Sequence, residues 1–158
     1  MKENESLFMV MLGCTPAGRL TEQHDIFFGI GKNLKELVPD MKTFWPEAKG
    51  KIHIDAWRKV SFVDSFKIEV VSPEENLPNP EKLFFINLGG YKENEFEEFH
   101  YKIVTVAKNK AEAIKKAKDV SNLYQSNIKP METDFLEKNQ LSSLKLETEP
   151  FSLYKVEI

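Results

Sequence analysis

The most specific chemical pattern in this sequence is a Glu-x-His pair that occurs twice, as Glu22-x-His24 and as Glu98-x-His100. Residues two apart share one face of a strand, so each pair would present a carboxylate beside an imidazole. If the two copies faced each other, these four side chains would form a site suited to a divalent metal such as zinc, iron or manganese. The alternative is that each His satisfies backbone groups at the mouth of a hairpin, and that its duplication records only common ancestry.

A second candidate site lies in the segment His53-Ile54-Asp55-Ala56-Trp57. Its alternation predicts a strand with His53, Asp55 and Trp57 on one face. A His beside an Asp can act as an oriented base, and an indole can form the floor of a small-ligand pocket. The other interpretation is an outward polar face on which the tryptophan tip reaches solvent. No serine or cysteine shows a local signature of activation, so the pattern favours binding over nucleophilic catalysis.

The segment from Gly13 to Leu20 has the glycine spacing of a phosphate-binding loop. It departs from that motif because Arg19 stands in the place of the lysine and Leu20 in the place of the magnesium-binding hydroxyl. A glycine-rich turn is therefore predicted, in which Arg19 is a candidate contact for an anionic ligand. The predicted ligand-binding residues are Arg19, His24, His53, Asp55 and Trp57.

Two similar halves of the chain carry these residues. Residues 7–42 align without a gap with residues 83–118, and ten of the aligned positions are identical, where about two would be expected by chance. Residues 72–82 lie between the halves and contain Pro73, Pro78 and Pro80. This composition continues neither a helix nor a sheet, so it predicts a linker.

Each half has the periodicities of the same elements. A short apolar run that ends at a glycine predicts a first strand, and a second strand follows it as a hairpin. Asn33 and Asn109 stand three residues before Glu36 and Glu112, a capping box that begins a helix. Pro39 predicts a kink or a late start of the first helix. The expected strands are residues 7–12, 24–30, 51–60 and 66–71 in the first half, and 83–88, 100–106, 144–146 and 153–158 in the second.

The predicted fold class is therefore α+β, with two tandem ββαββ repeats that have antiparallel sheet and one main helix per repeat. We expect a first repeat over residues 1–71, a Pro-rich linker over 72–82 and a second, more diverged repeat over 83–158. Neither half alone buries enough apolar surface to be stable by itself. The two repeats are thus expected to form one compact unit.

The first half resembles a bacterial domain-of-unknown-function family, number fifteen forty-three. The resemblance spans about residues 7–71 and rests on the strand that ends at Gly13, on Glu22-x-His24-Asp25, on the Pro39 and Trp45 segment and on His53-x-Asp55-x-Trp57. Similar proteins carry one or two copies of the domain, which agrees with a tandem two-copy form. The resemblance implies that a function shared by the family lies on the first copy, and it implies no activity, cofactor or catalytic residue.

The composition excludes several classes of protein. The 158 residues carry 25 acidic and 22 basic side chains that are mixed along the sequence, which leaves no basic surface for a nucleic acid. The apolar run of residues 7–12 is too short for a signal peptide or a membrane span. The single cysteine, Cys14, favours a reducing compartment. We expect a cytoplasmic protein that binds neither nucleic acid nor membranes.

These observations favour a non-catalytic binding or interaction module that uses the face of His53, Asp55 and Trp57, with His24 nearby, for a protein or small-molecule ligand. The alternative is a divalent-metal-dependent hydrolase or related enzyme with Glu-x-His ligands from both repeats. A further hypothesis is a structural subunit of an oligomer, such as a homodimer, because exposed sheet edges can pair with a second chain. No cofactor is predicted, and a divalent metal is left open.

Overall fold

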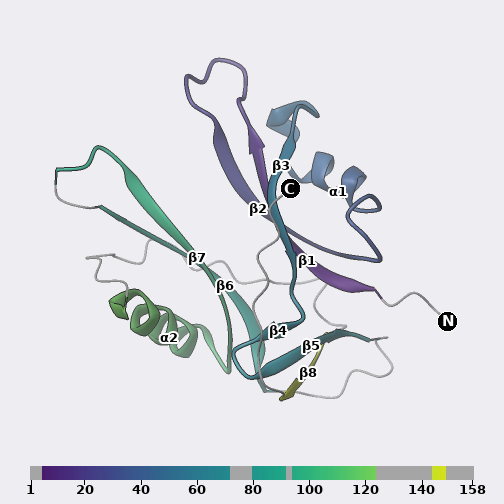
Figure 1. The fold of residues 1–158 in the computed structure, drawn as a ribbon, viewed down its shortest axis with the longest axis vertical. Coiled ribbons are helices and arrows are strands. Elements are labelled where there is room, and N and C mark those ends of the chain that lie inside the picture. The colour runs from purple at the N-terminus through teal and green to yellow at the C-terminus, as the bar shows by residue number, and fades with distance from the viewer. Residues whose placement is uncertain (1–4, 72–79, 92–93, 124–143, 149–158) are drawn as a thin grey trace.

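The computed structural model describes residues 5–71, 80–91, 94–123 and 144–148, and its fold is α+β with antiparallel sheets (Figure 1). Three sheets are present in these residues, with strand orders β2-β1-β3, β4-β5-β8 and β6-β7. The elements in chain order are β1 (Ser6–Cys14), β2 (Gln23–Gly31), α1 (Val38–Phe44), the 3-10 helix η1 (Pro46–Ala48), β3 (His53–Lys59), β4 (Phe62–Val63), β5 (Phe66–Val70), β6 (Lys82–Tyr91), β7 (Glu98–Ala107), α2 (Lys110–Leu123) and β8 (Leu144–Thr148).

Both predicted hairpins are present. β1 pairs with β2, and β6 pairs with β7, each in an antiparallel ladder without a register shift. The predicted third and fourth strands of the first half correspond to β3 and β5, and the short β4 lies between them. The predicted strand at residues 144–146 lies within β8, which pairs with β5 of the first half. The strand predicted at residues 153–158 lies outside the described residues.

The two capping boxes form as predicted, but only the second directly precedes a helix. The side-chain oxygen of Asn109 accepts a hydrogen bond from the backbone N–H of Glu112, at 3.0 Å, just where α2 begins. Asn33 makes the equivalent bond to Glu36 at 3.3 Å, yet α1 begins only at Val38, with Pro39 in its first turn. Proline is tolerated in the first turn of a helix because the N–H that it lacks has no partner there. The late start of the first helix is thus confirmed.

The core is arranged in layers around the two hairpins. One face of β1 packs under α1 and the other packs against the second hairpin, whose far face is covered by α2, so the helices lie on the outer sides (Figure 1). Phe28 of β2 and Phe85 of β6 meet edge-on between the hairpins, with 5.4 Å between their ring centres. The layer under α1 contains Phe8, Val10, Leu12, Phe27, Leu37 and Met41, and the layer between the hairpins contains Leu7, Val60, Val63, Ile68, Leu83 and Val106.

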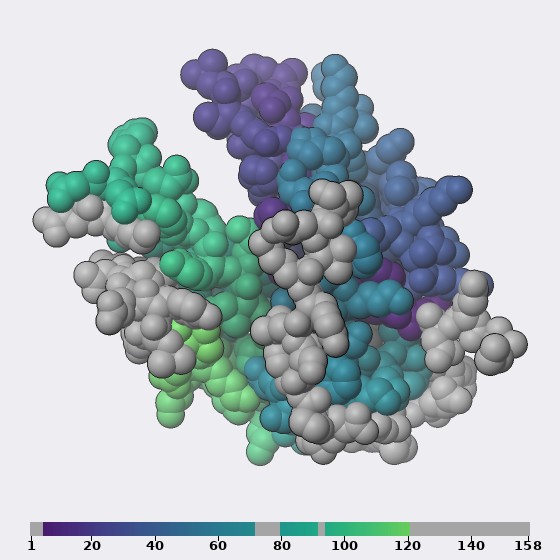
Figure 2. All heavy atoms as spheres, viewed as in Figure 1, coloured from purple at the N-terminus to yellow at the C-terminus, as the bar shows by residue number. Residues whose placement is uncertain are grey.

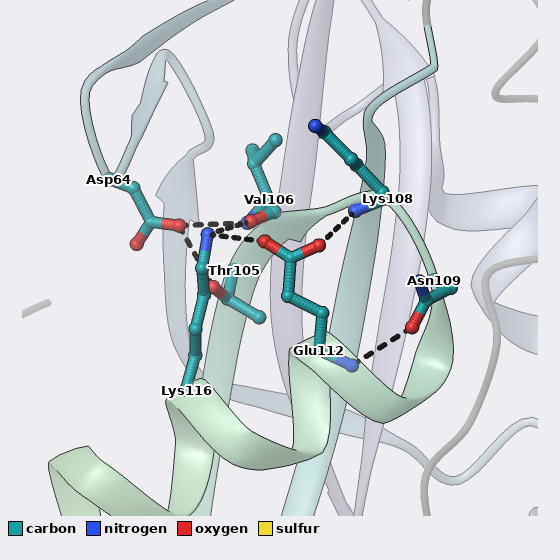
Figure 3. Close-up of polar contacts among 7 residues, drawn as sticks. All are labelled: Asp64, Thr105, Val106, Lys108, Asn109, Glu112 and Lys116. Carbon is teal, nitrogen blue, oxygen red and sulfur yellow. Dashed lines mark hydrogen bonds and ion pairs between the residues drawn. The ribbon is translucent and has the colours of Figure 1, made fainter.

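A carboxylate in the turn between β4 and β5 ties the first half of the chain to the second (Figure 3). Oδ2 of Asp64 accepts hydrogen bonds from Thr105 Oγ1, at 2.8 Å, and from the backbone N–H of Val106, at 2.9 Å. The backbone of Asp64 has a φ of 54°, a left-handed conformation in which Asp and Asn are enriched. On the other side of β7, Lys116 Nζ of α2 donates to the carbonyl oxygen of Val106 at 2.6 Å.

No helix in the described part of the chain is long and apolar enough to cross a membrane.

Candidate functional site

Two histidines stand on either side of Gly13 at one end of the β2-β1-β3 sheet. Gly13 of β1 is opposite His24 of β2 and also opposite His53 of β3. Residues that are directly opposite on neighbouring strands share one face of the sheet. The register therefore places both imidazoles on the same face, with only a glycine between them.

Two carboxylates complete this group. Glu22 immediately precedes β2, and Asp55 lies in β3 two residues after His53. His53 Nε2 is 2.9 Å from Glu22 Oε1 and 3.2 Å from Asp55 Oδ1. His24 Nε2 is 3.3 Å from Asp55 Oδ2 and 3.8 Å from Glu22 Oε2. Each imidazole thus contacts both carboxylates through its Nε2 atom, and we call Glu22, His24, His53 and Asp55 together the His–carboxylate face.

The glycine between the two histidines is needed for this packing. A Cβ atom built at Gly13 would lie against the Asp55 carboxylate and 2.5 Å from His53 Nε2. A glycine inside a strand commonly marks a place where other groups approach the backbone closely. Any side chain at position 13 would therefore push His53 and Asp55 away from their present positions.

A β-bulge in β3 separates Trp57 from the His–carboxylate face. The ladder between β1 and β3 skips Asp55, which is the extra residue of the bulge, and an extra residue reverses the alternation beyond it. Trp57 therefore lies on the opposite face together with Ile54, and its ring centre is 6.1 Å from that of Phe8. The prediction that Trp57 shares a face with His53 and Asp55 is wrong, because it assumed strict alternation through an unbroken ladder.

The His–carboxylate face is open to solvent and acidic. Its side chains are between 25% exposed, for Asp55, and 53% exposed, for His53. In the described ranges, the ion pairs that these four residues make are with one another and involve no Lys or Arg. The two carboxylates of the face attract a cation or a ligand with several hydrogen-bond donors.

The second Glu-x-His pair lies on the other hairpin. His100 of β7 is opposite Gly89 of β6, its Nε2 is 3.6 Å from Glu98 Oε2, and its Nδ1 is 3.3 Å from Asn87 Oδ1. No ion pair between described residues joins this pair to the His–carboxylate face. The loop ends of the two hairpins diverge in Figure 1, and a notch separates them in Figure 2.

Glu98, the acid of this second pair, affects the neighbouring hydroxyl of Tyr91. The negative charge of Glu98 and its hydrogen bond with Tyr91 raise the pKa of this exposed hydroxyl above its usual value. Within the described residues, no group of three or more His, Cys, Asp or Glu is arranged so that it could hold a metal ion. The four residues predicted as shared metal ligands thus form two separate groups in this structure.

The remaining predicted residue, Arg19, lies in the loop between β1 and β2. Its side chain is exposed, its backbone N–H donates to the Pro16 carbonyl at 3.1 Å, and Gly18 has a φ of 79°. These features are those of a glycine-containing turn. The neighbouring Cys14 is buried.

The sequence alone names every member of the His–carboxylate face and predicts that His24 lies near His53 and Asp55. It groups Glu22 only with His24 and the second Glu-x-His pair, as candidate metal ligands. A usable signal was Gly13, because a glycine at the end of a buried central strand leaves room for side chains from both neighbouring strands. Recognising it requires the knowledge that β1 pairs with β3 as well as with β2.

Comparison with solved structures shows a similar fold at low sequence identity. The chain is 22% identical to a protein from Idiomarina loihiensis, described as the crystal structure of a protein Il1583, with a TM-score of 0.68 over 98% of this chain and 93% of that chain. No curated protein matches this chain. Residues 19–70 match a family described as Domain of Unknown Function (DUF1543). The segment that contains the whole His–carboxylate face therefore resembles the DUF1543 domain family.

Proposed function

We propose that this protein is a non-catalytic binding module and that the His–carboxylate face receives its ligand. The observation that carries this proposal is the convergence of two imidazoles and two carboxylates from two separate segments of the chain over one glycine of a third. Each imidazole contacts both carboxylates at a half-exposed place, where a ligand can reach all four side chains. Such an arrangement is typical of sites that gain stability when a ligand binds.

The charge of the face selects the class of ligand. Glu22 and Asp55 supply acceptor oxygens, and a neutral imidazole supplies one donor and one acceptor. A cation or a ligand rich in donors would satisfy the carboxylates better than the histidines do. An anion would meet two negative charges, so a role of Arg19 as an anion contact would belong to a different ligand from the one on this face.

A divalent-metal-dependent hydrolase is the second candidate. It is favoured by the same convergence, because His and carboxylate are the ligand types of metal ions that activate water. The binding module is preferred because it requires only that the face hold a ligand, whereas a hydrolase would also require a substrate held beside an activated water.

We further propose that the two halves descend from a duplicated ββαββ unit and that the protein acts in the cytoplasm. The matching hairpins, the matching Gly–His register pairs and the matching Asn–Glu capping boxes support the duplication. The single cysteine supports a reducing compartment.

Thermal denaturation of the full chain with chemically defined cations tests the binding proposal. Spermidine, arginine amide and zinc chloride are added separately to the wild type and to the His53→Ala and Asp55→Asn variants. A probe that binds the native state should raise the Tm of the wild type by roughly 5–10 °C at 100 times its Kd. The gain should be lost in both variants.

A matched control is Glu47→Gln, which removes an exposed carboxylate in η1, away from the His–carboxylate face. Its response to the probes should equal that of the wild type. If no probe separates the wild type from the His53 and Asp55 variants, the proposal is wrong.

A further inference from the structure

We propose that the notch between the loop ends of the β1–β2 and β6–β7 hairpins binds a zwitterionic ligand, with an ammonium at one end and a carboxylate at the other, of the length of a short peptide. The ammonium binds at the His–carboxylate face, and the carboxylate binds deeper in the notch, at Arg58 and Lys102. This inference rests on the proposed function and describes its cationic ligand further.

The His–carboxylate face forms one wall of this notch. In β1, Leu12 packs under α1, whereas Met9 packs in the layer between the hairpins. Because side chains alternate along a strand, Gly13 faces the same way as Met9, and so do His24 and His53 opposite it. The face is therefore turned toward the second hairpin, across the notch that Figure 2 shows.

The second Glu-x-His pair lies on the opposite wall. Leu88 of β6 packs under α2, so its neighbours Asn87 and Gly89 face away from α2 and toward the first hairpin. The register places Lys102 opposite Asn87 and His100 opposite Gly89, on this same face. The two walls thus present their polar side chains to one another.

The notch is closed at its base by apolar side chains. Phe28 of β2 and Phe85 of β6 meet there, with 5.4 Å between their ring centres. Arg58 lies level with Phe28, because both are opposite Met9 of β1. On the other wall, Lys102 belongs to the next pair of residues after Phe85 toward the loop. Two basic side chains therefore lie near the base of the notch.

These two cations lack an acidic partner. Arg58 and Lys102 are both half-buried. Nη2 of Arg58 donates to the sulfur of Met9 at 3.3 Å, which is a weak acceptor, and burial lowers the pKa of the guanidinium. In the part of the chain that the structure describes, neither side chain forms an ion pair with a carboxylate. An anionic group of a ligand would supply the missing acceptor.

A carboxylate oxygen on the second wall lacks a donor. Oε2 of Glu98 is 3.6 Å from His100 Nε2. Oε1 of Glu98 is buried and has no hydrogen-bond partner among the described residues. A buried acceptor without a donor costs free energy, which an ammonium group would recover. Groups of both signs are thus incompletely satisfied on the walls of one notch.

The depth of the notch sets the length of the ligand. Glu98 and Lys102 are four residues apart in β7, and so are Met9, level with Arg58, and Gly13, level with the histidines. Four residues of a strand span about 14 Å, and the side chains shorten the gap between the charges. An extended peptide spans about 3.4 Å per residue, so two to four residues bridge the two positions.

Calorimetric titration of the full chain with tri-alanine at pH 7 tests this inference. N-acetyl-tri-alanine, which lacks the ammonium, and tri-alanine amide, which lacks the carboxylate, are titrated in parallel. We expect one tri-alanine per chain. Each capped peptide should bind at least about 10-fold more weakly, because a hydrogen bond to a charged group contributes roughly 10- to 100-fold in affinity.

Two variants assign each end of the peptide to its wall. Asp55→Asn should weaken binding of tri-alanine by about 10-fold or more, but should not weaken binding of the acetylated peptide further. Lys102→Gln should do the same for tri-alanine and spare the amide. The matched controls Glu47→Gln in η1 and Lys115→Gln in α2 change exposed side chains elsewhere and should bind as the wild type does. Circular dichroism establishes that each variant is folded.

Three outcomes would overturn the inference. These are no binding of tri-alanine by the wild type, equal binding of tri-alanine and either capped peptide, and unchanged binding of tri-alanine in Asp55→Asn or Lys102→Gln. If spermidine or arginine amide binds while tri-alanine does not, the zwitterion inference fails and the proposed function stands. If none of these probes binds, both fail.

Discussion

Replacing Asp64 is expected to loosen the attachment of the second hairpin to the rest of the protein. Asp64 accepts two hydrogen bonds, from Thr105 Oγ1 and from the Val106 backbone N–H, and Thr105 is only 3% exposed. The carboxylate itself lies toward solvent, so each bond should contribute about 1 kcal/mol, as a bond between neutral groups does, and less than a buried bond to a charged group. Loss of both bonds should therefore cost about 2 kcal/mol of unfolding free energy.

Because the backbone of Asp64 is left-handed, a comparison of variants separates the loss of the hydrogen bonds from backbone strain. Asp64→Gly removes the hydrogen bonds without strain, because glycine adopts a positive φ freely. Asp64→Ala removes the same bonds and adds about 1 kcal/mol of strain, since alanine resists the left-handed region. Asp64→Asn should be the mildest of the three changes, because an amide oxygen can still accept one bond and asparagine tolerates this conformation.

Urea denaturation of the full chain measures these differences. We expect a decrease of about 2 kcal/mol for Asp64→Gly and about 3 kcal/mol for Asp64→Ala, with unchanged dependence on urea concentration. In a chain of this size the decrease for Asp64→Gly corresponds to a fall in Tm of roughly 4–8 °C. The reasoning is refuted if Asp64→Gly lies within about 0.5 kcal/mol of the wild type, the range of an ordinary surface substitution.

Three other predictions follow from single contacts. Gly13→Ala should lower the unfolding free energy by no more than about 1 kcal/mol, because the added Cβ meets the ends of partly exposed side chains that can shift, and a double variant with His53→Ala should recover part of that loss in urea denaturation. Asn109→Ala should cost about 1 kcal/mol because its side chain caps α2, whereas Asn33→Ala should cost less because α1 begins further along the chain; the same assay compares the two. Glu98→Gln should lower the pKa of the Tyr91 hydroxyl toward its ordinary value, since the charge of Glu98 raises it, and NMR titration of the tyrosine ring would detect the shift; an unchanged titration would contradict the contact.

The local features of this fold could be predicted from the sequence. Apolar runs, alternation and the Asn–Glu capping boxes involve residues close together in the chain, and they predicted both hairpins and the start of α2. The capping box at Asn33 was recognised, yet the helix begins later because Pro39 is accommodated only in a first turn. Local signals thus located the elements to within a few residues.

The candidate site depended on contacts between distant segments. His24 and His53 meet because β1 accepts β3 on the edge opposite to β2, and no local pattern specifies that pairing. Strict alternation misplaces Trp57, because the bulge at Asp55 arises only in the ladder with β1. A period-2 pattern can therefore name the polar residues of a strand without determining which of them share a surface.

The pairing of β5 with β8 has a consequence for the growing chain during its synthesis. Val70 pairs with Leu144, so one edge of β5 has no partner strand until the ribosome has made β8. A nascent chain that stalls before residue 144 presents that edge, with its unpaired backbone groups, to other polypeptides. Until residues 144–148 have been made, this edge of β5 is therefore a place where pairing with another chain can start.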